Sequence, residues 1–99
     1  MITSKDFEVL DYLGQKWAHS IIEELDLEYC NALYDNYHRA HLYVWAHCKK
    51  HNPQALKCYD FEGPVFNSLN ESDADLILAQ NDYKDIILNA YSEMGGSNA

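Results

Sequence analysis

The chain has 99 residues, 47% of them hydrophobic and 13% aromatic, and its sixteen acidic side chains outnumber seven basic ones to give a formal net charge of −9. This apolar content is enough for one modest core, so we expect a single folded domain over residues 1–99 and exclude an acidic disordered tail. The charge should repel nucleic acid and membrane phosphates, which excludes direct contact with either and leaves a basic protein surface as the expected partner.

The first predicted element is a helix. An apolar stripe at steps of three and four residues runs through Phe7, Leu10, Gly14, Trp17, Ile21 and Leu25. This spacing predicts a helix over residues 4–26. Gly14 within it costs about 1 kcal/mol relative to alanine, so we expect that glycine to mark a close helix crossing or a bend.

The second predicted element, residues 28–51, has apolar side chains around most of its circumference. One stripe consists of Tyr29, Leu33, Tyr37, Ala40, Val44 and Cys48, and a second beside it of Cys30, Tyr34, His41 and Trp45. A helix of this kind is usually the most buried one of a domain. With only two acids and three bases, the segment is also close to neutral. We therefore expect residues 28–51 to form the central helix.

The segment over residues 52–70 is predicted to be irregular or to contain a short helix. Asn52-Pro53 ends the second helix and suits the start of another, while Gly63-Pro64 indicates a break.

A third main helix is predicted over residues 72–94. Its apolar face consists of Leu76, Ile77, Gln80, Tyr83, Ile87, Ala90, Tyr91 and Met94. Ser72 followed by Asp75 resembles a capping box, and Gly95-Gly96 is a typical helix stop. Three main helices around a buried middle one predict an all-α fold, a small single-domain helical bundle.

The sequence also indicates a cellular compartment. No apolar run approaches the ~20 residues that cross a bilayer, and Asp6 and Glu8 lie where a secretory signal would need basic residues. Cys30, Cys48 and Cys58 are odd in number and irregularly spaced, which favours reduced thiols over a disulfide framework. We therefore expect a cytoplasmic protein.

The acidic residues are the main candidates for a functional surface. Those of the last helix are separated by rises of about 5 to 12 Å, and phosphates of one DNA strand follow one another by about 3.4 Å, so the carboxylates could replace some phosphates. The predicted partner-binding residues are Glu23, Glu24, Asp26, Asp75, Asp82, Asp85 and Glu93. The alternative is that these acids form a solvated face that only keeps the protein soluble.

A metal site is the weaker hypothesis. His47 and His51, four residues apart, would lie on one helix face, and Cys58 could add a third ligand. Three mixed ligands without a fourth, and without a paired cysteine or histidine motif, are a weak zinc signal. We therefore expect no metal and no other cofactor, and keep a small metal-binding domain as an alternative. The competing interpretation is that the two histidines are favourable cations near a helix C-terminus.

The aromatic residues exceed what a core of this size can bury. Tyr and Trp are enriched at interface hot spots, so the surplus suggests a docking surface or a homodimer interface. The competing interpretation is that tyrosines lie at the core boundary with their hydroxyls in water. No glycine-flanked nucleophile or phosphate-binding loop is present, and we expect no enzymatic activity.

In size, acidity and aromatic content, the chain resembles the inhibitors that bacteriophages and mobile elements encode against restriction or CRISPR machinery. The resemblance covers the whole chain in kind but is carried by no residue string. It implies a non-enzymatic inhibitor that occupies a basic surface of a partner, such as a nucleic-acid-binding enzyme. The alternative is a structural or regulatory helical subunit, or a homodimer, that docks through apolar surface.

Overall fold

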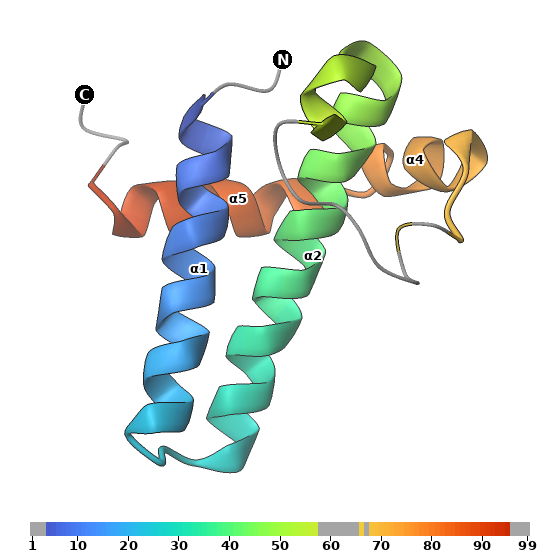
Figure 1. Ribbon diagram of the computed structural model, residues 1–99. Helices are drawn as coiled ribbons and strands as arrows, with labels where there is room; N and C mark the ends of the chain where they lie inside the picture. Colours follow the sequence, from blue (N-terminus) through green and yellow to red (C-terminus); the bar gives the residue numbers. More distant parts are fainter. Residues whose placement is uncertain (1–3, 58–65, 67, 96–99) are drawn as a thin grey trace.

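The computed structural model describes residues 4–57, 66 and 68–95, and all regular structure within them is helical. The helices are α1 (Ser4–Ile22), α2 (Leu27–His51), the 3-10 helix η1 (Pro53–Lys57), α4 (Glu71–Leu78) and α5 (Asn81–Glu93). Helices α1 and α2 form an antiparallel hairpin, and α5 crosses behind both of them (Figure 1). The predicted all-α bundle is therefore confirmed.

The core lies where α5 and α4 pack against the hairpin. Its buried side chains are Val9, Leu10 and Leu13 of α1, Ala40, Val44, Trp45, Ala46 and Cys48 of α2, Ala74 and Ile77 of α4, and Ile87 and Ala90 of α5. Helix α2 packs against α1, η1, α4 and α5. This confirms the prediction that the second helix is the central one.

The turn between α1 and α2 ends the first helix four residues earlier than predicted. The N–H of Leu25 donates to the carbonyl of Ser20 at 3.0 Å and that of Glu24 donates to Ile21 at 3.1 Å, which is the Schellman pattern. Glu24 has φ 53°, the left-handed conformation that glycine usually supplies there. Asp26 then caps α2 by accepting a hydrogen bond from the N–H of Tyr29 at 3.3 Å.

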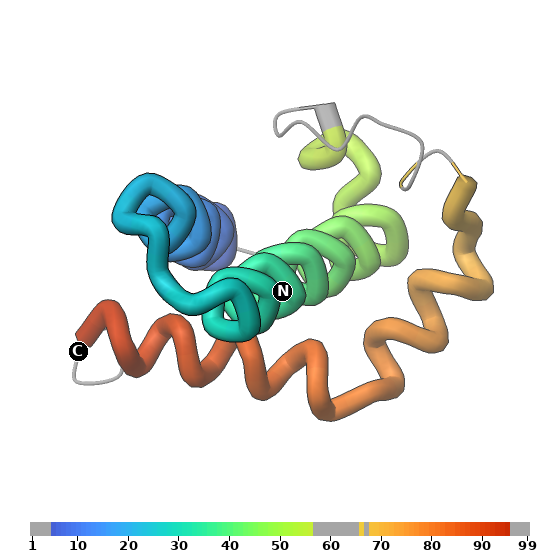
Figure 2. The backbone as a smooth tube through the Cα atoms, turned by 90° about the horizontal axis from the view of Figure 1, so that it is seen from below, coloured from blue at the N-terminus to red at the C-terminus, as the bar shows by residue number. Residues whose placement is uncertain are grey.

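The prediction of one continuous helix over residues 72–94 is wrong. The chain leaves the helical conformation at Gln80, with φ −98° and ψ 123°, and this divides the segment into α4 and α5. Helix α4 packs against α2, whereas α5 crosses both helices of the hairpin, so the chain must change direction between them. Figure 2 shows this change from below the hairpin.

The start of α4 also differs from the prediction. The capping box consists of Asn70 and Asp73 and does not involve Ser72. The Asp73 carboxylate accepts from the N–H of Asn70 at 2.9 Å, and the Asn70 side chain accepts from the N–H of Asp73 at 3.1 Å. Of the two possibilities left open after Pro53, an irregular segment or a short helix, the short helix is present as η1, while the predicted break at Gly63-Pro64 lies outside the described residues.

Gly14 marks a close helix crossing, which is one of the two features expected at its position, the other being a bend. A Cβ atom on Gly14 would lie 3.1 Å from Cε1 of Tyr37 on α2. The Tyr37 ring is stacked on Trp17, with 6.2 Å between centroids, and meets His41 edge-on at 4.8 Å. The missing side chain therefore gives an aromatic ring of α2 room to lie against α1.

Candidate protein-docking surface on the α1–α2 hairpin

Two of the seven predicted acidic site residues join helices to one another. Glu93 Oε1 accepts hydrogen bonds from Lys16 Nζ at 2.7 Å and from the Tyr12 hydroxyl at 3.0 Å, which ties α5 to α1. Asp75 Oδ1 lies 2.9 Å from Lys50 Nζ and ties α4 to α2. The Lys16 hydrogen bond lowers the pKa of Glu93 and raises the pKa of Lys16. These two carboxylates thus have partners inside the fold.

The other five acids are exposed and fall into two groups. Glu23, Glu24 and Asp26 belong to the turn at the hairpin tip, and Glu23 Oε1 lies 3.9 Å from Nε2 of exposed His19. Asp82 and Asp85 are exposed residues of α5. Figure 1 shows that the tip extends well beyond the point where α5 crosses the hairpin. The structure therefore does not bring the predicted residues into one continuous surface.

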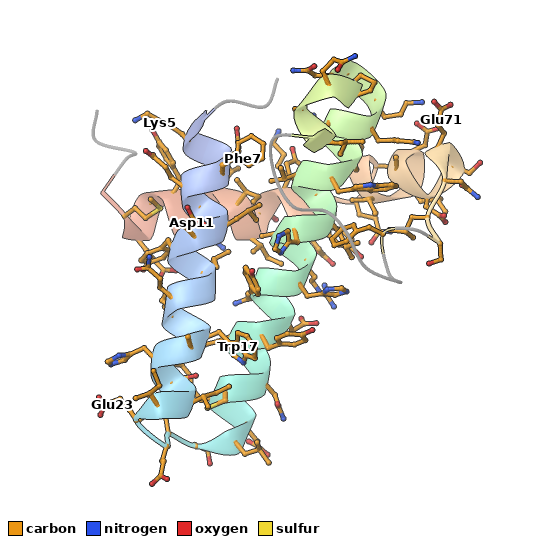
Figure 3. The ribbon with its side chains drawn as sticks, in the orientation of Figure 1. Lys5, Phe7, Asp11, Trp17, Glu23 and Glu71 are labelled. Atoms are coloured by element: carbon orange, nitrogen blue, oxygen red, sulfur yellow. The ribbon has the colours of Figure 1, made fainter. Side chains whose placement is uncertain are left out.

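The hairpin tip is also where exposed apolar side chains concentrate. Six of the nine large apolar residues that are exposed in the described chain lie there: Ile21 (51%), Ile22 (77%), Leu25 (45%), Leu27 (73%), Tyr29 (48%) and Tyr34 (46%). Among the residues that the structure describes, the parts of α1 and α2 below the α5 crossing pack only against each other (Figure 3). The apolar stripes of α1 and α2 that are buried in the core continue into the tip, and there their side chains are exposed to solvent.

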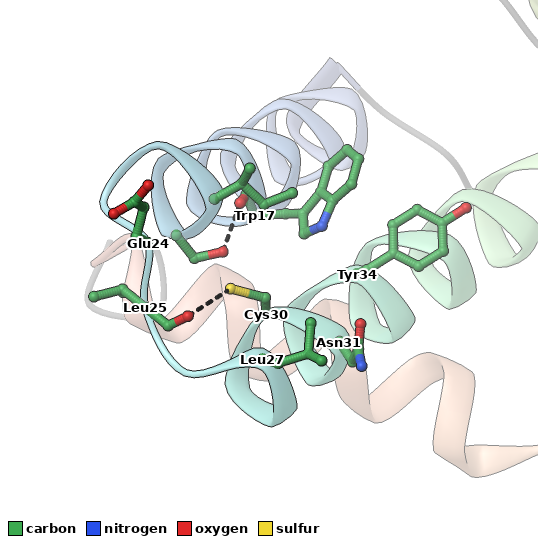
Figure 4. A pocket seen from close by; sticks show the side chains of 9 residues that line it. Trp17, Glu24, Leu25, Leu27, Cys30, Asn31 and Tyr34 are labelled. Atoms are coloured by element: carbon green, nitrogen blue, oxygen red, sulfur yellow. Dashed lines mark hydrogen bonds between the residues drawn. The ribbon is translucent and has the colours of Figure 1, made fainter.

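Two adjoining hollows run along the junction of the two helices. The one at the tip has a volume of about 490 Å³ and is lined by Trp17, Ser20, Ile21, Glu24, Leu25, Leu27, Cys30, Asn31 and Tyr34 (Figure 4). The second has a volume of about 300 Å³ and is lined by Leu10, Asp11, Gly14, Gln15, Trp17, Ala18 and Tyr37. Trp17 lines both hollows. We refer to these two sets of residues together as the hairpin groove.

Polar groups in the floor of the hairpin groove are already bonded within the fold. Ser20 is buried, and its hydroxyl donates to the carbonyl of Trp17 at 2.6 Å. The Cys30 thiol donates to the carbonyl of Leu25 at 3.6 Å. Trp17 and Tyr34 lie with their ring centroids 4.9 Å apart. The groove therefore offers an occupant mainly aromatic and aliphatic surface.

The residues of the metal hypothesis lie at the other end of α2. The rings of His47 and His51 have centroids 5.7 Å apart, and burial lowers the pKa of His47. Cys58, the third predicted ligand, lies outside the described residues. Within the described part of the chain, no group of three or more His, Cys, Asp or Glu side chains could hold a metal ion.

Several residues of the groove were predicted only as members of apolar helix stripes, and no groove was predicted among them. Trp17, Ile21 and Leu25 belong to the stripe that predicted the first helix, and such a stripe does not reveal where its covering partner ends. Leu27, an apolar residue between two acids, was the clearest available signal of an exposed apolar surface.

No helix in the described chain is long and apolar enough to cross a bilayer. No protein-family model, curated protein or solved structure matches the chain.

Proposed function

We propose that this chain is a non-enzymatic protein-binding module that docks onto a basic surface of a partner protein through the tip of the α1–α2 hairpin. The observation that carries the proposal is the mixture of exposed apolar residues such as Ile21 and Leu25 with the carboxylates of Glu23 and Glu24. In interfaces of this composition, apolar and aromatic contacts supply most of the affinity. The acids would add association rate and orientation.

A partner with a strongly basic site fits the charge of the chain best. The net charge is −9, and the tip carries nine consecutive exposed positions, 21–29, each of which is acidic or apolar. The nucleic-acid channel of an enzyme is such a site, and a protein that filled it would inhibit the enzyme. The chain would then act like the inhibitors of phages and mobile elements that it resembles in size and charge.

Two charge-reversal variants test which acidic group contacts the partner. Glu23→Lys/Glu24→Lys changes the tip, and Asp82→Lys/Asp85→Lys changes α5, and both remove the same amount of negative charge. Asp26 is left intact because it caps α2. Each variant is first checked for wild-type helicity by circular dichroism and then used as bait in host lysate at low and high salt.

We expect the wild type to capture a partner with a basic site and to release it at high salt, because charge-led contacts weaken as salt screens them. We expect the tip variant to lose this partner and the α5 variant to keep it. The affinity of the purified partner for the three proteins then measures the effect. Loss in the α5 variant alone would place the docking surface on α5. Unchanged binding in both variants would contradict an acidic docking surface.

A self-associating structural subunit is the second candidate function. It is favoured by the high exposure of Ile22 and Leu27, 77% and 73%. The acids of the turn oppose it, because two copies that met through their tips would bring like charges together. Analytical ultracentrifugation separates the two candidates. A dimer that high salt strengthens and Leu27→Gln abolishes would support self-association, and a monomer at both salt concentrations would exclude it.

A further inference from the structure

We infer that the hairpin groove binds a basic amphipathic helix supplied by the partner protein. The inference rests on the proposed function and names the kind of segment that docks.

The groove lies on the face of the hairpin that α5 leaves open. Tyr12 and Lys16 of α1 contact Glu93 of α5, whereas Gly14 and Trp17 line the groove. Two residues along an α-helix turn through about 200°, so Tyr12 and Gly14 point in nearly opposite directions. Figure 2 shows α5 on one side of the hairpin. One face is thus packed by a helix, and the opposite face presents a groove between two helices.

The dimensions and lining of the groove suit a helix. Its α1 residues extend from Leu10 to Ile21, a rise of about 17 Å or roughly three turns. At the tip, the lining residues recur at helical spacing on both walls, as expected of a seam between two helices. An amphipathic helix fills such a seam with apolar side chains three and four residues apart. Trp17, Tyr34 and Tyr37 supply the aromatic contacts typical of interface hot spots.

Charge selects the kind of helix. The charged side chains that line the groove are Asp11 and Glu24, both acidic, and Glu23 and Asp26 flank its open end. A helix with lysine or arginine beside its apolar stripe would place positive charge against these rims. A second copy of this chain fits poorly, because the exposed side of its α5 carries acids such as Asp82. The occupant is therefore a segment of a different, basic protein.

A synthetic helix of leucine and lysine is a direct probe. A peptide of about 18 residues spans about 27 Å as a helix, enough to cover the groove. Its leucines are placed three and four residues apart, and a scrambled peptide of the same composition keeps the charge but loses the apolar stripe. Binding is measured by isothermal titration calorimetry at physiological ionic strength. We expect the amphipathic peptide to bind at least about tenfold more tightly than the scrambled one.

Two adjacent isoleucines give a matched pair of protein variants. Ile21 and Ile22 are both exposed on α1, but only Ile21 lines the groove. We expect Ile21→Gln to lower the affinity for the amphipathic peptide roughly tenfold or more. This is the loss expected when a buried aliphatic side chain is removed from a contact. We expect Ile22→Gln to bind like the wild type. Neither residue belongs to the core, so both variants should fold.

Equal binding of the two peptides, or equal losses in the two variants, would overturn the inference. The partner captured from lysate separates this failure from a failure of the proposed function. If Glu23→Lys/Glu24→Lys loses that partner while Ile21→Gln keeps it, the docking module stands and the groove inference is wrong. Loss in both Ile21→Gln and the tip variant, with retention by Ile22→Gln, is the result that supports the groove.

Discussion

At the scale of single residues, the contacts of Glu93 with Lys16 and Tyr12 show that an acid predicted to bind a partner protein can instead join two helices of the same chain. The Glu93 and Lys16 side chains are 48% and 30% exposed. Ion pairs so open to solvent contribute little net free energy, typically below about 1 kcal/mol. The tie therefore fixes where α5 lies on α1 more than it stabilises the domain.

The Glu93 carboxylate gives a prediction about pH. The lowered pKa in the folded protein means that its stabilisation is present above the ordinary value of 4.5 and is lost as the pH falls through the folded-state pKa. We expect Glu93→Gln to reduce the free energy of unfolding by about 0.5 kcal/mol at neutral pH, and the difference from wild type to disappear in acid. Urea unfolding of both proteins across the pH range measures this difference in the free energy of unfolding.

The matched control for this prediction is Asp85→Asn, which removes an exposed acid of the same helix. A difference from wild type that persisted unchanged in acid would show that Glu93→Gln acts by something other than the loss of charge.

At the scale of elements, the break between α4 and α5 has only a weak local signal, the poor helix formers Asn81 and Asp82 that follow it. Ala79 and Gln80 are both good helix formers, and no glycine or proline interrupts the pattern. Gln80 is the N-cap of α5, yet its side chain makes no capping hydrogen bond. The turn is imposed by the packing of the two helices, and it leaves the first N–H groups of α5 without a side-chain cap.

Replacement of Gln80 distinguishes a broken helix from a continuous one. Serine at an N-cap position should stabilise the protein by about 0.5 to 1 kcal/mol, because its hydroxyl can accept from a backbone N–H of the first turn. In an uninterrupted helix the same change would be unfavourable by up to about 0.7 kcal/mol. Thermal or urea unfolding gives the sign. Gln80→Ala, which offers no cap, serves as the control and should not stabilise.

Much of the secondary structure could be predicted because it follows local periodicity. The stripe through Leu33 and Val44 predicted a central helix, and Gly14 predicted a close crossing or a bend. What could not be predicted depends on distant residues: where α5 crosses the hairpin decides that Leu10 is buried and Ile21 exposed. The pairing of Glu93 with a lysine far along the chain and the exposure of Asp82 also depend on how distant helices pack, so neither can be predicted from composition.

At the scale of the whole molecule, the core and the candidate surface occupy different parts of the hairpin. The buried cluster lies near the α5 crossing, and the exposed apolar residues lie beyond it. The excess of acids acts on the whole fold, because repulsion among like charges opposes a compact state. The principal extents are 37 × 35 × 25 Å, so most pairs of acids are much farther apart than the partners of an ion pair.

This geometry predicts that added salt stabilises the fold. Raising the ionic strength from about 0.01 to 0.15 M shortens the Debye length from about 30 to about 8 Å, which screens repulsion across the molecule more than attraction within close ion pairs. We expect the Tm to rise by a few degrees, measured by circular dichroism. Asp82→Lys/Asp85→Lys, with less negative charge, should show a smaller rise. A fall in Tm would mean that ion pairs outweigh repulsion.

The left-handed residue in the hairpin turn brings folding and docking into conflict. Glycine would adopt the φ of 53° at position 24 freely, whereas a residue with a Cβ atom does so at a cost of about 1 kcal/mol. The chain instead places there a carboxylate at the open end of the groove. Glu24→Gly would make the turn more stable but would remove a carboxylate from the end of the groove. A variant stabilised in this way would therefore lose part of the surface that we propose for docking.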